Sequence, residues 1–298
     1  MVAGVEEVVV ATPPSNDGSV HAAVLYAAVR SGAMRVVKVG GAQAVAALAY
    51  GTDSVPAVDK VVGPGNVYVT EAKRQLNGVI GIDSLAGPSE LVLIADSSAD
   101  PAFLATDLVA QAEHDPDASA VFMTPDGDLL NATLKALEVE VARAGRREIV
   151  EQALAKHGRA VLVADLDHAA DVANDLAPEH LQIVTEDPRA LAVKIRNAGA
   201  IFLGDWTPVP FGDYGVASNH VLPTSGTARF SSGLRAADFV TVSSVVEMSE
   251  ASAAALAPGV AEIARAEGLV GHARAVLIRA ERAAERAGER ATTKEPAP

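Results

Sequence analysis

The sequence predicts an α/β protein whose parallel sheets carry helices on both faces. The first observation behind this class is that short β-branched runs alternate with longer Ala-rich helical patterns. The second is that no internal repeat of fixed length interrupts this alternation. The third is size: 298 residues, 49% of them hydrophobic, can bury one large core or two smaller ones.

The predicted elements follow one another as strand and helix pairs. The run EEVVVA (6–11) precedes the helical pattern VHAAVLYAAVRSGA (20–33), and RVVKVGG (35–41) precedes AQAVAALAYG (42–51). Four later runs are also predicted to be strands: ELVLIAD (90–96), AVLVADL (160–166), LQIVT (181–185) and AIFLGD (200–205).

These elements fall into two Rossmann-like α/β domains and a small C-terminal helical domain. The loop DSLAGPSE (83–90) separates residues 1–88 from residues 89–234. The first domain is expected to be incomplete at its N-terminal side, because the chain opens almost directly on a strand. Beyond DFVTVSSVVEM the pattern is almost purely helical, which predicts a helical domain over residues 235–298 with a disordered TTKEPAP tail.

Composition narrows the classes of function. A net charge of -14 argues against a nucleic-acid partner, which usually requires a basic face. The chain has no cysteine, so a transition metal would need His, carboxylate or amide ligands. No apolar run is long enough to span a membrane and the N-terminus lacks a signal-peptide pattern, so we expect no membrane partner and a cytoplasmic location.

Two short stretches combine residues that could carry chemistry. In VAQAEHDPDA, Gln111 and His114 are three residues apart, so on a helix they would share one face, as half of a metal site or as a polar helix end. In DLAPEHLQIV, Pro178 should end a helix and leave Glu179 and His180 adjacent in a loop. A carboxylate beside an imidazole suits general acid–base catalysis, although a surface pair is the alternative interpretation.

A third stretch, GDYGVASNHVLPT, follows the strand AIFLGD. It places Asp213 and His220 on a loop that we expect at the carboxyl end of a strand, the usual site edge in open α/β sheets; turn formation is the alternative. His272 lies in an Ala-rich helix five residues after Glu267, and by itself it indicates only an exposed helical histidine. We also expect three other histidines, His21, His157 and His168, at the surface.

Two glycine-containing turns lead from strands into helices. KVGGAQA (38–44) and VVGPGNVYVTEAK (61–73) would leave free backbone amides that suit the phosphates of a dinucleotide. The G-x-G-x-x-G fingerprint is absent, because Tyr68 occupies the third glycine position, so a structural turn is an equal alternative.

Taken in order, six blocks of the chain closely resemble the histidinol dehydrogenase family, from about residue 2 to about residue 285. The resemblance implies zinc-dependent oxidation of L-histidinol through L-histidinaldehyde to L-histidine, the last steps of histidine biosynthesis, with two NAD+ reduced in turn. The blocks are GGAQAVAALAYGT, VDKVVGPGNVYVTEAKRQL, GIDSLAGPSELVLIAD, DLVAQAEHDPDA, LAPEHLQI and GDYGVASNHVLPT.

The resemblance also implies roles for individual residues. Glu179 would activate water, and His180 would act as the acid–base group. The Zn2+ ligands would be Gln111, His114 and Asp213, with His272 of the partner subunit completing the set in a homodimer. The implied substrate contacts are Ser89, Gln111, His114, His180, Asp213, His220, Glu267 and His272, with Glu267 also coming from the partner, and the implied NAD+ contacts are Gln43 and Asn66.

The sequence departs from the family in two ways. An N-terminal segment that family members normally have is missing, and its loss would leave an unpaired edge and an uncovered apolar face on the second sheet. Ala217 stands where the family usually has glycine, which would strain the loop if that position needs a positive φ. We therefore keep a second hypothesis, in which the chain is an inactive relative that binds zinc or a ligand, or another protein.

Overall fold

The computed structural model describes residues 2–216 and 219–292. The chain separates into two compact units, Met1–Val240 and Thr241–Pro298. The predicted boundary between residues 88 and 89 falls inside the first unit, so the division into two α/β domains stays a prediction. The predicted TTKEPAP tail lies, apart from its first residue, outside the described residues.

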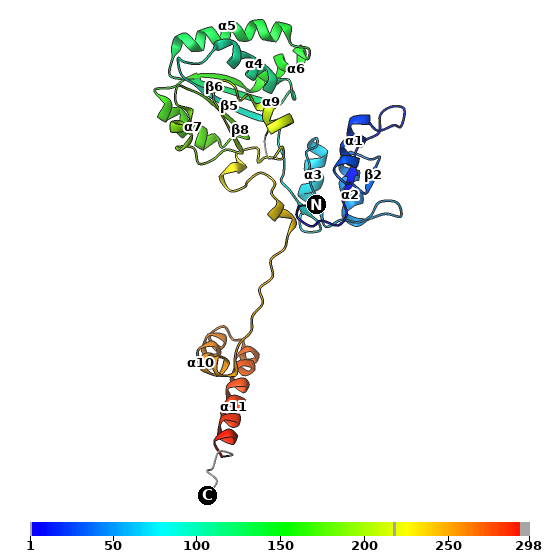
Figure 1. Ribbon diagram of the computed structural model, residues 1–298, viewed down its shortest axis with the longest axis vertical. Helices are drawn as coiled ribbons and strands as arrows, with labels where there is room; N and C mark the ends of the chain where they lie inside the picture. Colours follow the sequence, from blue (N-terminus) through cyan, green and yellow to red (C-terminus); the bar gives the residue numbers. More distant parts are fainter. Residues whose placement is uncertain (1, 217–218, 293–298) are drawn as a thin grey trace. The chain divides into compact units, whose positions relative to one another are not determined.

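A five-stranded parallel sheet forms the centre of the first unit (Figure 1). Its strand order is β7-β6-β5-β8-β9, so the chain starts in the middle and turns back once to add strands on the other side. Leu91 is paired with His180, and His180 with Ala200. The strands are β5 (Glu90–Ala95), β6 (Ser119–Thr124), β7 (Gly158–Leu162), β8 (His180–Val184) and β9 (Ala200–Leu203).

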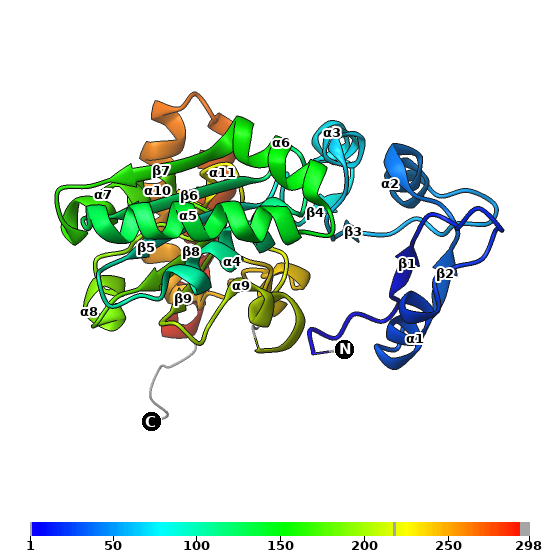
Figure 2. The ribbon, with the colours of Figure 1, turned by 90° about the horizontal axis from the view of Figure 1, so that it is seen from above.

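Helices cover both faces of this sheet, as the alternating pattern predicted (Figures 1 and 2). Leu91, Leu93 and Phe122 pack on one face against the three helices between residues 101 and 157. Val92 and Leu181 pack on the other face against the two helices between residues 166 and 192. Strands buried on both faces need continuous apolar runs, which is why ELVLIA forms the central strand. The helices are α4 (Pro101–Ala112), α5 (Gly127–Arg143), α6 (Arg147–His157), α7 (Leu166–Leu176) and α8 (Pro188–Ala192).

Before the large sheet, the chain forms two smaller parallel pairs of strands with three helices. The pair β1–β2 and the pair β3–β4 share a small core with Val45, Leu48 and Ile80. The elements are β1 (Val9–Ala11), α1 (Ala22–Arg30), β2 (Arg35–Val37), α2 (Gly41–Tyr50), β3 (Lys60–Val61), α3 (Val67–Leu76) and β4 (Gly81–Ile82).

A buried ion pair ties α3 to the end of β4. The Lys73 ammonium lies 2.6 Å from the Asp83 carboxylate, and the two side chains are 3% and 2% exposed. Asp83 also accepts hydrogen bonds from the backbone amides of Gly63 and Ser84, both at 2.7 Å. Asp83 therefore holds the turn after β3, the helix α3 and the chain leaving β4 in one arrangement.

After β9 the first unit ends in short helical turns. They are α9 (Val209–Phe211), a π-helical turn η1 (Gly212–Val216), and two 3-10 turns, η2 (Thr227–Arg229) and η3 (Ala236–Phe239). Val209 is buried in the core on the α4 face of the sheet, so α9 returns along that face.

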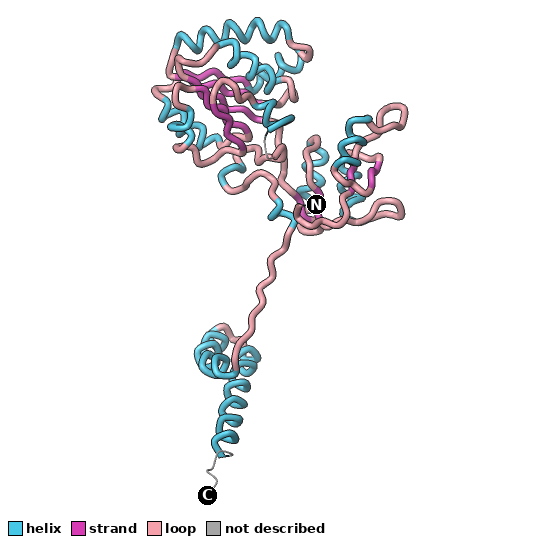
Figure 3. Tube along the Cα trace, viewed as in Figure 1, coloured by secondary structure: helices cyan, strands magenta, loops and turns pink. Residues whose placement is uncertain are grey.

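The second unit contains two helices, α10 (Glu250–Ala266) and α11 (Val270–Thr292), preceded by residues 241–249, which form neither helix nor strand (Figure 3). Ala261, Ala264 and Ala273 are buried where the two helices pack. Small side chains let the helix backbones approach closely, which explains the Ala-rich sequence. No helix in the described part of the chain is both long and apolar enough for a membrane span.

We expect Lys73→Met to lower the free energy of unfolding by about 3–5 kcal/mol, because it leaves the Asp83 charge buried without its partner. Urea unfolding of the 298-residue chain would measure the loss. The matched control is Lys156→Met at the exposed Lys156–Asp117 pair, 3.1 Å apart, where we expect a change within about 1 kcal/mol. Equal losses in the two variants would contradict the role given to the buried pair.

Candidate functional site

The candidate site gathers at the edge of the large sheet where the strands begin. Glu90 and His180 are the first residues of β5 and β8, and parallel pairing puts them at the same edge. Helix α4 returns from the far edge to connect two parallel strands, so its last turn, with Gln111, ends at this edge too.

This location corrects the expectation that Asp213 and His220 lie at the carboxyl end of a strand. Asp213 Oδ1 is 4.0 Å from His180 Nε2, at the amino end of β8. The reason is that the chain turns back after β9, with Val209 buried in the core on the α4 face of the sheet, and the π-helical turn with Asp213 follows α9. A neighbouring expectation on Ala217 lies outside the described residues.

Glu179 is buried at the point where α7 has ended and β8 has not begun. Its side chain is only 10% exposed, and one carboxylate oxygen accepts a hydrogen bond from the Glu90 amide at 3.0 Å. The Ser89 hydroxyl donates a second hydrogen bond. Burial, with the nearby charges of Glu90 and Asp213 adding to it, raises the pKa of Glu179 to about 7. Such a carboxyl group can exchange protons near neutral pH.

His180 was predicted to lie in a loop, but it is the first residue of β8. Its side chain is 6% exposed. Its Nδ1 is 3.2 Å from the Glu90 carbonyl oxygen. Because a carbonyl only accepts, this contact favours the tautomer with hydrogen on Nδ1 and leaves Nε2 free as a base. Burial lowers the pKa of His180, and the neighbouring Asp213 opposes that shift.

Asp213 connects two histidines. Its side chain is 7% exposed, and Oδ1 lies 3.2 Å from Nδ1 of His220, whose own side chain is 58% exposed. His220 therefore faces solvent at the mouth of the site, while His180 lies inside it.

Gln111 and His114 do not share a helical face, because α4 ends at Ala112. Gln111 is 2% exposed, and neither atom of its amide group has a hydrogen-bond partner among the residues that the structure describes. His114 is exposed, yet it lies near enough for its charge to lower the pKa of His180. A buried amide without partners is costly, so Gln111 is the side chain that most clearly lacks a ligand.

The two residues predicted to contact NAD+ lie at helix starts. Gln43 is in the first turn of α2, and Asn66 caps α3 by accepting from the amides of Tyr68 and Val69 at 3.1 and 3.2 Å. Both are exposed. Asn66 thus has a structural role as a helix cap, and the contacts with NAD+ stay predictions.

Glu267 and His272 belong to the second unit. Glu267 is the C-cap of α10, His272 lies in the first turn of α11, and both are exposed. His21, His157 and His168 are exposed as expected.

Within residues 2–216 and 219–292, no three His, Asp or Glu side chains are grouped as a metal site. The predicted ligand set differs from such a group in kind, because it includes an amide and takes its fourth member from another subunit.

Two features of the site were not predicted from the sequence. Glu90 contacts both Glu179 and His180, although its position next to Ser89 could have suggested it. Asp107 accepts from the buried Gln182 amide at 2.7 Å, and burial raises the pKa of Asp107 to about 6.

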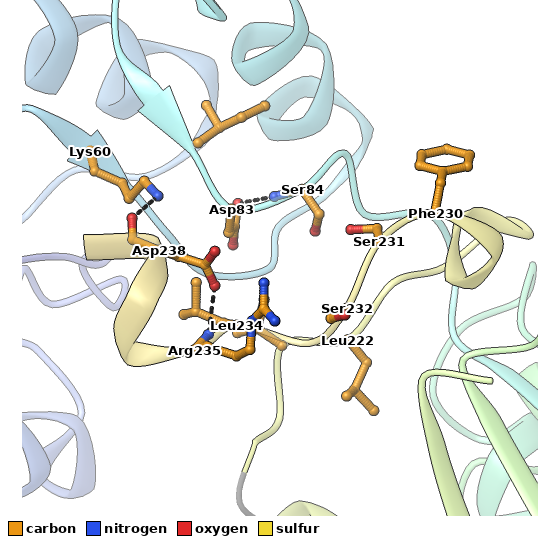
Figure 4. A pocket seen from close by; sticks show the side chains of 12 residues that line it. Lys60, Asp83, Ser84, Leu222, Phe230, Ser231, Ser232, Leu234, Arg235 and Asp238 are labelled. Carbon is orange, nitrogen blue, oxygen red and sulfur yellow. Dashed lines mark hydrogen bonds between the residues drawn. The ribbon is translucent and has the colours of Figure 1, made fainter. Parts of the chain in front are cut away.

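A separate cavity of about 190 Å³ lies beside Asp83 (Figure 4). Lys60, Arg235 and three serines line it, and Lys60 donates to the Asp238 carbonyl with its ammonium 5.4 Å from the Phe239 ring centre. None of the predicted site residues lines this cavity.

The fold and the site define a helix-covered parallel α/β protein with buried acid–base groups at the amino edge of its sheet. Comparison with known proteins is more specific: the family model described as histidinol dehydrogenase matches residues 1–280. The chain belongs to the histidinol dehydrogenase family, as its sequence blocks indicated.

Individual relatives agree with this assignment. A histidinol dehydrogenase from a Synechococcus species is 50% identical over 278 residues, 93% of this chain and 64% of the relative. One from Moorella thermoacetica is 50% identical over 280 residues, 94% of this chain and 66% of the relative. The crystal structure of histidinol dehydrogenase from Elizabethkingia anophelis superposes with a TM-score of 0.88 at 36% identity, covering 93% of this chain and 64% of that one. The chain thus spans a little under two-thirds of their length.

The raised pKa of Glu179 predicts a pH dependence of stability. Between pH 4.5, the ordinary pKa of a glutamate, and about pH 7, the carboxyl is ionised in the unfolded chain but protonated in the folded one. The free energy of unfolding should therefore fall as the pH rises through this window, by on the order of 3 kcal/mol from this group. We expect Glu179→Gln to lose that part of the fall, as measured by urea unfolding at pH 5 and pH 8.

The control is Glu186→Gln, which removes an exposed carboxylate for which the structure shows no side-chain partner. Its free energy of unfolding should fall with rising pH as much as that of the wild type. The same pH dependence in both variants would show that Glu179 titrates normally.

Proposed function

We propose that the chain catalyses the NAD+-linked, zinc-dependent oxidation of L-histidinol to L-histidine through L-histidinaldehyde, in the cytoplasm. The observation that carries this proposal is the buried pair of Glu179 and His180 beside Asp213, in a chain of this family. A carboxyl group with a pKa of about 7 and an imidazole with a free Nε2 are the two groups that an alcohol-to-acid oxidation requires.

His180 serves as the base for the alcohol. Its Nε2 accepts the hydroxyl proton as the hydride leaves the adjacent carbon, and the Glu90 carbonyl at Nδ1 stabilises the charged ring that forms. Asp213, 4.0 Å from Nε2, favours the same charged state.

Glu179 serves in the second half of the reaction. Its carboxylate takes a proton from a water molecule, whose oxygen adds to the aldehyde carbon and gives the hydrated aldehyde as its anion. His180, having released its first proton to solvent, then takes the remaining hydroxyl proton as the second hydride leaves, and the carboxylate is the product. In total one water is consumed, two hydrides are transferred and three protons are released.

The residues of this chain fit part of what Zn2+ and NAD+ would need. Bound NAD+ would supply the hydride acceptor, and bound Zn2+ would supply a Lewis acid that orients the substrate. Gln111, His114 and Asp213 would hold the metal in this chain, and the unpaired, buried Gln111 amide is the observation in favour. His272 of the partner subunit would complete the set.

The remaining assignments concern binding. Gln43 and Asn66 would contact NAD+, and His220 at the mouth of the site would contact the substrate with Glu267 of the partner subunit in a homodimer. Ser89 would have two roles, because its hydroxyl already donates to Glu179.

NADH formation by the 298-residue chain with L-histidinol, NAD+ and Zn2+ tests the proposal. We expect Glu179→Gln and His180→Asn each to lower kcat by roughly 10²–10⁴-fold. In a single turnover, Glu179→Gln should still complete the first oxidation and stop near one NADH per site, whereas His180→Asn should slow both oxidations.

Glu186→Gln is the matched control and should keep full activity. Zinc-loaded, folded chain that forms no NADH with L-histidinol would contradict the proposed activity for this chain, as would equal NADH yields from the two site variants.

Zinc binding gives a test that is independent of activity. Calorimetric titration of Zn2+ should show that Gln111→Ala and Asp213→Asn weaken binding by more than the roughly 10–100-fold that loss of an outer-shell partner costs. The controls Gln152→Ala and Asp171→Asn change the same residue types at exposed positions and should bind as the wild type does. Unchanged affinity in the first two variants would remove both residues from the ligand set.

A further inference from the structure

Glu90 contacts both candidate catalytic residues through three different groups. Its backbone amide donates to a carboxylate oxygen of Glu179 at 3.0 Å, and its carbonyl oxygen lies 3.2 Å from Nδ1 of His180. Its side chain makes the reverse hydrogen bond: Oε2 of Glu90 accepts from the Glu179 amide at 3.4 Å. Glu90 and Glu179 therefore hold each other by reciprocal hydrogen bonds from amide to carboxylate.

The second oxygen of the Glu90 side chain reaches a different segment. Oε1 accepts from the Ser225 amide at 3.1 Å. Ser225 has φ of +56°, which a residue other than glycine adopts only when its surroundings hold it there. Next to it, the Thr224 hydroxyl accepts from the Gly87 amide at 2.6 Å, so the turn at residues 224–226 is fastened to the chain entering β5 at two points.

An ionised carboxylate satisfies both of these donors, although burial raises the pKa of Glu90. Both of its oxygens accept, and here each faces a backbone amide. Glutamine of the same shape offers one acceptor and one NH2 group, so one of the two amides would face another donor and lose its hydrogen bond.

We propose that Glu90 is a positioning residue, whose side chain holds Glu179 and the turn at residues 224–226 in the geometry that the site needs. It acts through Glu179 and touches neither substrate nor cofactor. This inference rests on the proposed function for its catalytic consequence, whereas the hydrogen-bond arrangement can be tested without any activity.

The first test is amide hydrogen exchange by NMR on the 298-residue chain, comparing wild type with Glu90→Gln. The Glu179 or the Ser225 amide should exchange about tenfold faster, as expected for the loss of one hydrogen bond. The amide of residue 90 should also exchange faster, although its own backbone is unchanged, because its acceptor is the Glu179 carboxylate that has moved. Core amides such as those of Leu93 and Ile183 serve as the internal control and should keep their protection.

The second test is kinetic. Glu90→Gln should lower kcat about tenfold with little change in KM for L-histidinol, and should resemble Glu179→Gln by slowing the second oxidation more than the first. In a Glu179→Gln background the same substitution should add little to the loss of kcat, because the part of its effect that reaches the chemistry passes through the Glu179 carboxylate. A merely structural role would lower activity equally in both backgrounds.

Glu90→Asp covers the case in which glutamine prevents folding. It keeps the charge and both acceptors but shortens the side chain by one methylene, so we expect it to fold and to lose protection at one of the two amides. Glu186→Gln is the control for both tests.

Unchanged exchange at residues 90, 179 and 225 in the folded variants would overturn the proposal, as would loss of protection throughout the core. Additive losses of kcat with Glu179→Gln would overturn it too. If the wild-type chain shows no turnover, the proposed function fails for this chain, and the exchange pattern alone still decides whether Glu90 holds Glu179 and the turn.

Discussion

The register of β5 against β8 is the constraint on which the site depends. Leu91 is paired with His180, so Glu90 lies one step before this pair, at the height of Glu179. From that single alignment the Glu90 amide and carboxylate contact Glu179, just before β8, and its carbonyl contacts His180, the first residue of β8. A shift by one residue would exchange the two faces of β8 and put His180 among the apolar helices on the other side.

Much of the fold could be predicted from the sequence because buried parallel strands need long apolar runs. ELVLIAD and LQIVT carry that signal, and both are strands of the large sheet. The strand Ser119–Thr124 was not identified although it is as long as β5, and the two-residue strand β4 leaves too few residues for a pattern. AVLVADL is displaced: β7 begins at Gly158 and ends at Leu162, because pairing with β6 decides where a strand starts.

The site could be predicted by resemblance but not by local pattern. Sequence spacing put Gln111 and His114 on one helix, and a general rule for α/β sheets put Asp213 at the carboxyl edge; both expectations were wrong. The first failed because α4 already stops at Ala112, two residues before His114, and the second failed because the chain turns back after β9. Glu90 was not predicted because its role comes from four contacts with three residues about 90 and 135 positions away, which no window of sequence contains.

The orphan amide of Gln111 has a consequence for the life of the protein in a cell. Among the described residues both of its polar atoms lack a hydrogen-bond partner, which costs stability. A ligand bound to this amide would offset that cost, and by mass action it would stabilise the fold more as its concentration rises above its Kd. Chains without the ligand would then unfold more often and be degraded faster by proteases. The abundance of the protein would therefore rise with the concentration of its ligand, without a separate regulator.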